Sequence, residues 1–250
     1  MGAVPPPASR CLVVADAHLG QVPESVARAF HTFLDTVPQP GDELVVNGDL
    51  FDFWFEYGTV VPRRHLATVM KLAGLVQRGI PVTFLGGNHD RWGGDFLRRD
   101  MGIGYHSGPA ELVLAGRRAL VVHGDGLTEQ HWSGALLHWL LRQPLTIAVF
   151  RMLHPAIGFW IADRLSGTLA DSTKDKAVLD RAEAAQAAYA RALLEQRTDL
   201  SLVVMAHTHR PRLEDVGNGR AYVNPGAFLD GGRYAVITPE SVDLKTFTDV

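Results

Sequence analysis

Residues 10–20 read RCLVVADAHLG, a short valine-rich apolar run followed directly by polar residues. An unbroken apolar run of this length is typical of a strand that is buried on both faces of a sheet. The same arrangement recurs in residues 43–49 (ELVVNGD) and in residues 80–90 (IPVTFLGGNHD). Segments with helical periodicity, residues 23–37 and 62–79, separate these strands. The alternation of strand and helix predicts a layered α/β domain.

The pattern changes after the third strand, where hairpins and one long helical segment replace the alternation. Residues 111–122, 212–223 and 234–247 each predict a β-hairpin, and the second of them carries an Asn-Gly pair that favours a type I′ turn. Residues 127–197 are mostly helical and contain an alanine-rich amphipathic stretch at 173–196. The sheet-forming chain is therefore expected to be interrupted by a helical insertion.

The composition of the 250 residues is that of a globular protein without a basic excess. Hydrophobic residues make up 46% of the chain, and the formal net charge is −3. Nucleic-acid binders usually carry a basic excess, so we expect no nucleic-acid partner. Cys11 is the single cysteine, which excludes an internal disulfide, and no apolar stretch reaches the ~18 residues of a membrane span. We expect a cytoplasmic protein with these parts: a lead without fixed structure (1–9), a core (10–126 and 198–250) and a helical cap (127–197).

Residues that commonly bind metals cluster where the expected strands end. Because the carboxyl ends of strands in an open α/β sheet face one crevice, distant segments can deliver their side chains to one place. The set offers carboxylate, amide and imidazole groups without a thiolate, which suits Mn²⁺, Fe or Zn²⁺ and excludes a Cys-rich structural zinc site. Seven ligands are too many for one ion and suffice for two if one carboxylate bridges them. The candidates are Asp16, His18, Asp49, Asn88, His123, His207 and His209.

Each of these motifs has an ordinary structural explanation when it is taken alone. An Asp after a strand usually forms a turn or caps a helix, and a lone His usually belongs to the core or the surface. Five such motifs, all at strand ends, favour a metal centre over these explanations. The role of His154 is left open. The histidines without a paired ligand context are assigned to packing or to the surface: His31, His65, His106, His131 and His138.

The strand-end motifs resemble those of the calcineurin-like metallophosphoesterases: Asp16-x-His18, Gly48-Asp49, Gly87-Asn88-His89-Asp90, His123 and His207-x-His209. The match spans residues 10–228. The resemblance implies a four-layer α/β fold, in which helices flank two packed β-sheets, and a dinuclear metal centre. By the resemblance, one ion has the ligands Asp16, His18, Asp49 and His209, and the other has Asp49 (bridging), Asn88, His123 and His207. His89 is then a catalytic group near the phosphate, and Asp90 is a candidate to orient it or to act as a simple turn residue.

A finer resemblance concerns residues 47–57, NGDLFDFWFEY, which are similar to a segment of UDP-2,3-diacylglucosamine hydrolases. These enzymes release lipid X and UMP in lipid A biosynthesis. Residues 123–126 and 207–211 and the helical insertion are similar to the same group. There are two departures: the best-known branch has Arg where this chain has His89, and residues 224–226 look more like general phosphodiesterases. The alternatives are a phosphoesterase of the same superfamily that acts on a nucleotide or a phosphoprotein, and a non-catalytic scaffold of this fold.

The insertion is more apolar than an ordinary surface lid between residues 132 and 161. These side chains either pack the cap onto itself and the core, or form an acyl-chain groove or a patch that docks on the inner membrane. Basic residues near them would neutralise a diphosphate, although a solvated helix face is their more ordinary role. We expect two divalent ions, with manganese as the first choice and iron or zinc as alternatives, and leave the oligomeric state open. The candidate substrate-binding residues are Trp139, Phe150, Arg151, Arg164, Lys174, Lys176 and Arg210.

Overall fold

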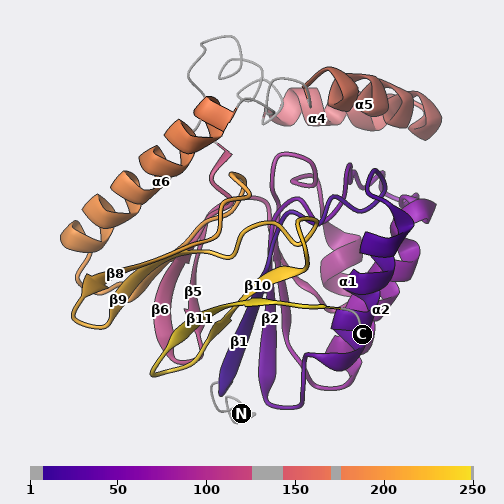
Figure 1. Cartoon of the computed structure of the whole chain (residues 1–250). Helices are drawn as coiled ribbons and strands as arrows, with labels where there is room; N and C mark the ends of the chain where they lie inside the picture. The colour runs from indigo at the N-terminus through magenta and orange to yellow at the C-terminus, as the bar shows by residue number, and fades with distance from the viewer. Residues whose placement is uncertain (1–7, 126–142, 170–175, 249–250) are drawn as a thin grey trace.

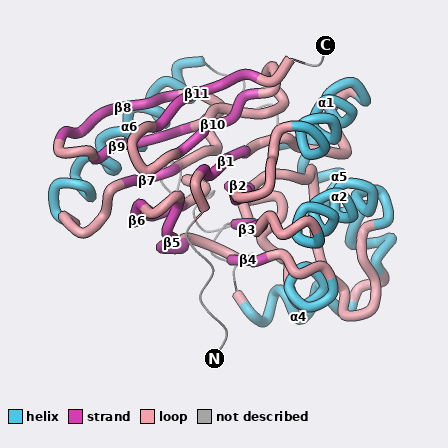
Figure 2. Tube along the Cα trace, turned by 90° about the horizontal axis from the view of Figure 1, so that it is seen from below, coloured by secondary structure: helices cyan, strands magenta, loops and turns pink. Residues whose placement is uncertain are grey.

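The computed structural model describes residues 8–125, 143–169 and 176–248, and the structural statements below concern these residues. Two mixed β-sheets pack against each other, and helices cover both outer faces (Figure 1). Helices α1 (Glu24–Thr36) and α2 (Leu66–Gln77) cover the first sheet, and α6 (Lys176–Gln196) covers the second. Seen from below, the strands form two rows with α1 and α2 beside the first row (Figure 2). This confirms the expected fold of two packed sheets flanked by helices.

The first sheet has the strand order β11-β10-β1-β2-β3-β4. Strands β1 to β4 run parallel. On the other side of β1, β10 pairs antiparallel with β1, and β11 pairs antiparallel with β10. The parallel arrangement brings the carboxyl ends of β1, β2 and β3 to one edge. The strands are β1 (Arg10–Val14), β2 (Asp42–Asn47), β3 (Val82–Leu85), β4 (Gly104–His106), β10 (Arg233–Ile237) and β11 (Val242–Thr246).

The second sheet has the strand order β5-β6-β7-β9-β8. Its central strands β6, β7 and β9 are parallel, and β5 and β8 are antiparallel edges. Asn218 and Gly219 both have positive φ, 54° and 68°, at the turn between β8 and β9, as the expected type I′ turn requires. The strands are β5 (Ala110–Leu114), β6 (Arg117–Val121), β7 (Leu202–Val204), β8 (Arg212–Gly217) and β9 (Arg220–Asn224).

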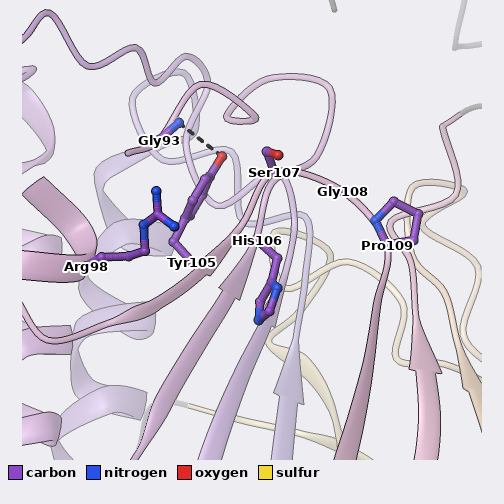
Figure 3. A pocket seen from close by; sticks show the side chains of 7 residues that line it. All are labelled: Gly93, Arg98, Tyr105, His106, Ser107, Gly108 and Pro109. Atoms are coloured by element: carbon purple, nitrogen blue, oxygen red, sulfur yellow. Dashed lines mark hydrogen bonds between the residues drawn. The ribbon is translucent and has the colours of Figure 1, made fainter. Parts of the chain in front are cut away.

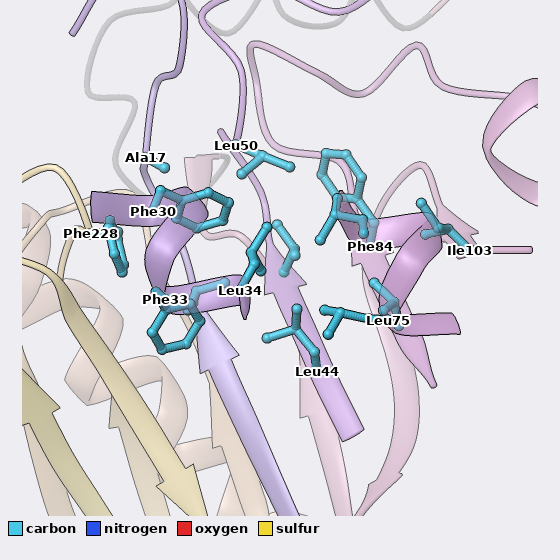
Figure 4. Packing of buried hydrophobic residues seen from close by; sticks show 14 of the residues in the cluster. Ala17, Phe30, Phe33, Leu34, Leu44, Leu50, Leu75, Phe84, Ile103 and Phe228 are labelled. Carbon is cyan, nitrogen blue, oxygen red and sulfur yellow. The ribbon is translucent and has the colours of Figure 1, made fainter. Parts of the chain in front are cut away.

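Strand β1 shows why its sequence is apolar throughout. Alternate side chains of a strand point to opposite faces. Leu12 and Val14 therefore pack with α1 and α2, whereas Cys11 and Val13 pack between the two sheets. Figure 4 shows the helix-facing side of this core, where the aromatic rings of α1 meet Phe228. Burial of each such large side chain contributes about 1.5–3 kcal/mol to folding.

Among the described residues, three helices lie between β6 and β7. They are α4 (Pro144–Met152), α5 (Pro155–Leu169) and α6. Proline is the first residue of α4 and of α5, where its missing N–H costs no hydrogen bond. Helices α4 and α5 lie above the ends of the strands, and α6 runs down along the second sheet (Figure 1).

Two short elements differ from the expectation. Strand β4 has only three residues, and a single π-helical turn spans Phe96–Asp100. The helix expected from residue 62 begins with a 3₁₀ turn at Arg63–His65 before α2. Elements of three to five residues are too short to show a periodicity, so pairing with β3 decides the conformation of β4 rather than its own sequence.

Candidate metal centre

All seven expected ligand residues lie in loops that follow strand ends, and both sheets contribute. The loops after β1, β2 and β3 come from the first sheet, and those after β6 and β7 come from the second. Asp49 Oδ2 lies 3.2 Å from His123 Nε2 and 3.9 Å from His18 Nε2. Asp16 Oδ1 lies 3.6 Å from His209 Nε2. Side chains up to 193 residues apart therefore meet within a few ångströms.

The donor atoms form three overlapping groups. Within each group, the atoms lie within 4.8 Å of one another. Asp49 and His18 each belong to two groups, so Asp49 lies between the two ends of the cluster. The groups are Asp16, His18 and His209; His18, Asp49 and His89; and Asp49, His123 and His207.

The backbone at these residues adopts an unfavourable conformation. Among the described residues, seven non-glycine residues have positive φ, and five of them are expected ligands. A non-glycine residue in this region costs about 1–3 kcal/mol and persists only where the surrounding structure holds it. The strain is concentrated where the chain turns its ligand side chains toward one point. The five ligands are Asp16 (51°), His18 (45°), Asp49 (50°), His207 (71°) and His209 (58°).

Unpaired buried atoms test whether the site fits a metal ion. Asp16 Oδ1, Asn88 Oδ1 and His123 Nε2 are buried and have no hydrogen-bond partner. Buried polar atoms in folded proteins are almost always paired, so three unpaired acceptor or donor atoms in one cluster need an explanation. Carboxylate, amide and imidazole groups are ligands of divalent cations. The residues of this cluster therefore fit a divalent metal centre.

The electrostatics of the cluster keep two histidines ready to bind metal. Burial lowers the pKa of His18 and of His207 to about 3, so both rings are neutral at pH 7. Metal ions bind neutral imidazole. Burial also lowers the pKa of His123, but the carboxylates of Asp49 and Asp16 outweigh it and raise the pKa to about 10. The proton on His123 supplies the positive charge that these buried carboxylates require.

The hydrogen bonds of His123 orient its ring toward the cluster. Nδ1 donates to the carbonyl oxygen of Asn47 at 2.9 Å, which leaves Nε2 facing Asp49. Asp125, two residues after His123, forms an ion pair with Arg91. Burial raises the pKa of Asp125, but Arg91 outweighs it and lowers the pKa to about 2. Asp125 is therefore an ion-pair partner in the wall next to the cluster.

His89 lies at the edge of the cluster with one ring nitrogen held. Its Nδ1 lies 2.8 Å from the carbonyl oxygen of Asp52, and its Nε2 lies 4.0 Å from Asp49 Oδ2. The carboxylate of Asp52 is in turn 3.0 Å from Nε2 of buried His65 and 3.1 Å from Arg64 Nη2. His65 was expected to be a packing or surface residue, and no expectation covered the contacts of Asp52 or Arg64. The only signal for them was their position near the second metal motif.

The contacts of Asp90 match the second of its two expected roles, that of a turn residue. Its carboxylate accepts four backbone N–H bonds and holds the loop after β2, whereas the atom that orients His89 is the Asp52 carbonyl oxygen. Burial and the Asp49 carboxylate raise the pKa of Asp90 to about 7. These contacts favour the turn role of Asp90, and its catalytic role stays a prediction. The donors are the N–H groups of Gly87 (2.8 Å), Asp49 (3.1 Å), Leu50 (2.7 Å) and Phe51 (3.2 Å).

We expect Asp90→Ala to lower the free energy of unfolding by about 3 kcal/mol or more, because it leaves several buried N–H groups unpaired. Urea unfolding followed by circular dichroism measures this change. Asp95→Ala is the control, since Asp95 is exposed and its ion pairs with Arg98 and Arg99 lie on the surface. Normal stability of Asp90→Ala combined with a loss of turnover would restore the catalytic role.

Two cavities lie near these loops. The larger, about 560 Å³, adjoins His123 and is lined by core residues together with Ile147 of α4 and Tyr189 of α6. The other, about 420 Å³, is lined by none of the seven ligand residues (Figure 3). In it, the Tyr105 hydroxyl accepts a hydrogen bond from the Gly93 N–H at 3.0 Å. The cavity beside His123 is the better candidate for substrate because it joins the metal cluster to the inserted helices.

Among the described residues, the expected substrate-binding side chains do not gather in one place. Trp139 and Lys174 lie outside the described residues, and so does the side chain of Lys176. Arg151 and Arg164 are exposed and do not line the cavity beside His123; the Arg164 guanidinium lies over the Trp160 ring. Arg210 pairs with Asp180 of α6 at 3.1 Å.

Phe150 packs on the core instead of lining an open groove. Its ring centroid is 4.7 Å from that of Phe55 and 6.2 Å from that of Phe53. The buried rings that follow β2 present an aromatic surface, and α4 and α5 cover it. The structure therefore assigns Phe150 to the contact between the inserted helices and the core.

Comparisons with known proteins place this site in a family. The profile of the family Calcineurin-like phosphoesterase matches residues 9–211. A UDP-2,3-diacylglucosamine hydrolase of Porphyromonas gingivalis is 31% identical over 173 residues, which cover 64% of this chain and 65% of that protein. Another, from a Shewanella species, is 28% identical over 240 residues, or 95% of this chain and 96% of that protein. The solved structure of Vacuolar Protein Sorting 29 from Cryptosporidium parvum is similar with a TM-score of 0.43 and 12% identity, over 95% of both chains.

The family match includes all seven ligand residues. The family implies divalent metal ions, and the clustered, partly unpaired donor atoms are suited to hold them. The chain therefore belongs to the calcineurin-like phosphoesterase family and is a metal-dependent phosphoesterase.

Proposed function

We propose that this enzyme hydrolyses the diphosphate of UDP-2,3-diacylglucosamine to lipid X and UMP, a step of lipid A biosynthesis. The observation that carries the proposal is a relative named for this activity that matches 95% of the chain, including the helical insertion. Their identity is 28%, and the resemblance of residues 47–57 points to the same substrate.

We assign the ligands to two divalent ions that share Asp49. Asp16, His18 and His209 complete one site, and Asn88, His123 and His207 complete the other. Mn²⁺ is the proposed metal, with Fe or Zn²⁺ as alternatives, because oxygen and imidazole ligands suit all three. When bound, such ions neutralise charge on a phosphoryl group and make hydroxide available near neutral pH.

His89 is the proposed general acid. Because Nδ1–H donates to the Asp52 carbonyl oxygen, the ring is fixed with Nε2 toward the cluster. In this orientation, a proton on Nε2 can be donated to the leaving oxygen. The ion pair of Asp52 with Arg64 and its contact with His65 hold the segment that carries this carbonyl.

The inserted helices are proposed to form a cap, residues 127–197, that selects the lipid-linked part of the substrate. Ile147 and Tyr189 bring α4 and α6 to the wall of the cavity beside His123. Trp92 lines the same wall, and Arg91 adds a buried positive charge that is balanced by Asp125. An apolar wall next to a phosphate-binding cluster suits a molecule that carries acyl chains close to a diphosphate.

We expect the acylated UDP-sugar to be cleaved with a kcat/KM at least about tenfold above that of its deacylated form, because acyl burial contributes about 0.8 kcal/mol per CH₂. Product analysis with Mn²⁺ measures both rates. Ile147→Asn is expected to raise KM for the acylated substrate about tenfold and to leave cleavage of a small aryl phosphodiester unchanged. Val113→Asn is the control, since Val113 is exposed on β5 and does not line the cavity. Equal kcat/KM for the two UDP-sugars would exclude the lipid substrate and leave a phosphoesterase of another specificity.

An apolar face on α4 and α5 supports contact with the inner face of the inner membrane. Met152 is 86% exposed, Leu145 76% and Trp160 60%. Arg151 and Arg164 are exposed on the same two helices, which suits anionic headgroups. In the described residues, no helix has the length and hydropathy needed to span a bilayer. The proposed contact is therefore peripheral.

Met152→Glu combined with Trp160→Glu is expected to weaken sedimentation with anionic phospholipid vesicles by about tenfold or more. The double variant loses two apolar side chains that would enter the bilayer, and it gains negative charge. Metal binding and aryl phosphodiester cleavage are expected to stay normal. Met70→Glu, on the exposed face of α2, is the matched control. Unchanged sedimentation of the double variant would remove this face from the proposal.

A further inference from the structure

Gln186 is a fully buried amide in the middle of α6, on the side that faces the second sheet. Its Nε2 donates to the carbonyl oxygen of Ala206 at 3.0 Å. Its Oε1 accepts from the Tyr222 hydroxyl at 3.2 Å and from Asn224 Nδ2 at 3.4 Å. A buried amide with partners on both sides is held in one orientation, and it holds its partners in turn.

These partners connect Gln186 to two of the loops that carry metal ligands. Ala206 directly precedes His207, and its N–H donates to the carbonyl oxygen of His123 at 2.9 Å. A chain of hydrogen bonds thus runs from the His123 loop through Ala206 to Gln186. Asn224 Nδ2 also donates to Thr208 Oγ1, the residue between His207 and His209, at 3.1 Å.

Gly124 shows how closely the helix approaches the first loop. It follows His123 with φ +106°, and a Cβ built there would lie 2.4 Å from Gln186 Nε2. A side chain at this position would displace the amide. The loop after β6 and helix α6 are therefore in close contact at Gly124, directly after the ligand His123.

The loop at residues 207–209 needs such support. His207 and His209 both have positive φ, which is unfavourable for residues with a side chain. Hydrogen bonds to Ala206 and Thr208 hold the backbone at the residues that precede and separate these two histidines. Groups that orient metal ligands typically change metal affinity about 10- to 100-fold when they are removed.

We propose that Gln186 is a positioning residue of the metal centre. It holds the His207–His209 loop against the His123 loop, so that the last helix of the insertion contributes to metal affinity in addition to shaping the substrate cavity. This inference rests on the proposed metal assignment and not on the identity of the substrate.

The test compares Gln186→Met with wild type in the metal-free full-length protein. Methionine keeps the approximate volume and removes both sets of hydrogen bonds. Titration calorimetry with Mn²⁺ alone is expected to show a dissociation constant raised about 10- to 100-fold. Leu194→Ala is the control, because Leu194 is equally buried in the cluster that packs α6 on the second sheet and lies eight residues beyond Gln186 on the same helix. That variant is expected to lower the melting temperature and to bind Mn²⁺ normally.

The outcomes separate the inference from the proposed function. Wild-type affinity in Gln186→Met, or equal weakening in Leu194→Ala, would overturn the positioning role. Failure of the wild-type protein to bind Mn²⁺, Fe²⁺ or Zn²⁺ would instead overturn the proposed metal centre. If Gln186→Met does not fold, Tyr222→Phe removes one donor to Gln186 Oε1 and keeps the packing. It is expected to weaken Mn²⁺ binding about fivefold, and unchanged binding there would equally count against the role.

Discussion

Asp49→Ala is expected to remove both metal ions and to lower turnover on the order of 10⁴-fold. Asp49 belongs to two of the three ligand groups and lies 3.2 Å from His123 and 3.9 Å from His18. Loss of one electrostatic contact to the reacting group lowers the turnover rate about 10²–10³-fold, so loss of two ions is expected to lower it by at least the larger factor. Plasma mass spectrometry of protein prepared without chelator is expected to give two ions per chain for wild type and almost none for the variant.

His18→Ala is the informative comparison, because His18 and Asp16 complete only one of the two proposed sites with His209. The variant is expected to bind one of the two ions more weakly and to bind the other normally. His106→Ala serves as the control, since His106 lines the separate cavity shown in Figure 3. A wild-type stoichiometry fixed at one ion under saturating Mn²⁺ would contradict the shared role of Asp49.

His89→Ala is expected to keep both ions and to lower kcat about 10²–10⁴-fold, the loss typical of a general acid or an electrostatic donor. The reason is geometric: Nδ1 is held by the Asp52 carbonyl oxygen and Nε2 faces the cluster, 4.0 Å from Asp49. Metal content and the rate with an aryl phosphodiester are measured on the same sample.

The pH profile of the His89 variant distinguishes a general acid from a purely structural residue. Loss of a proton donor is expected to remove the alkaline limb of kcat in the variant, whereas a change in folding alone leaves the profile unchanged. A near-normal rate with full metal occupancy would show that His89 has no part in the chemistry.

Much of the fold follows from local sequence patterns. The apolar runs that predict β1, β2 and β3 and the apolar faces that predict α1 and α2 are found at nearly the same residues. Burial of an apolar run and of a helix stripe is encoded by neighbours in sequence, so it is readable without a structure. β4 was not foreseen because three residues carry no periodicity, and its hydrogen bonds come from β3.

The sequence by itself determined which residues are the candidate metal ligands, because Asp, Asn and His at strand ends offer the oxygen and nitrogen atoms that divalent ions bind. Only the tertiary structure decided how they are held. Asp90 accepts hydrogen bonds from four backbone N–H groups, Asp125 forms an ion pair with Arg91, and Phe150 packs on the aromatic rings after β2. Likewise, Gln186 reaches the His207 loop from a helix that carries no ligand. These roles depend on which partner lies close in space. Most of the partners are 20 to 95 residues away in the chain, so their closeness is set by the packing of both sheets and not by local sequence.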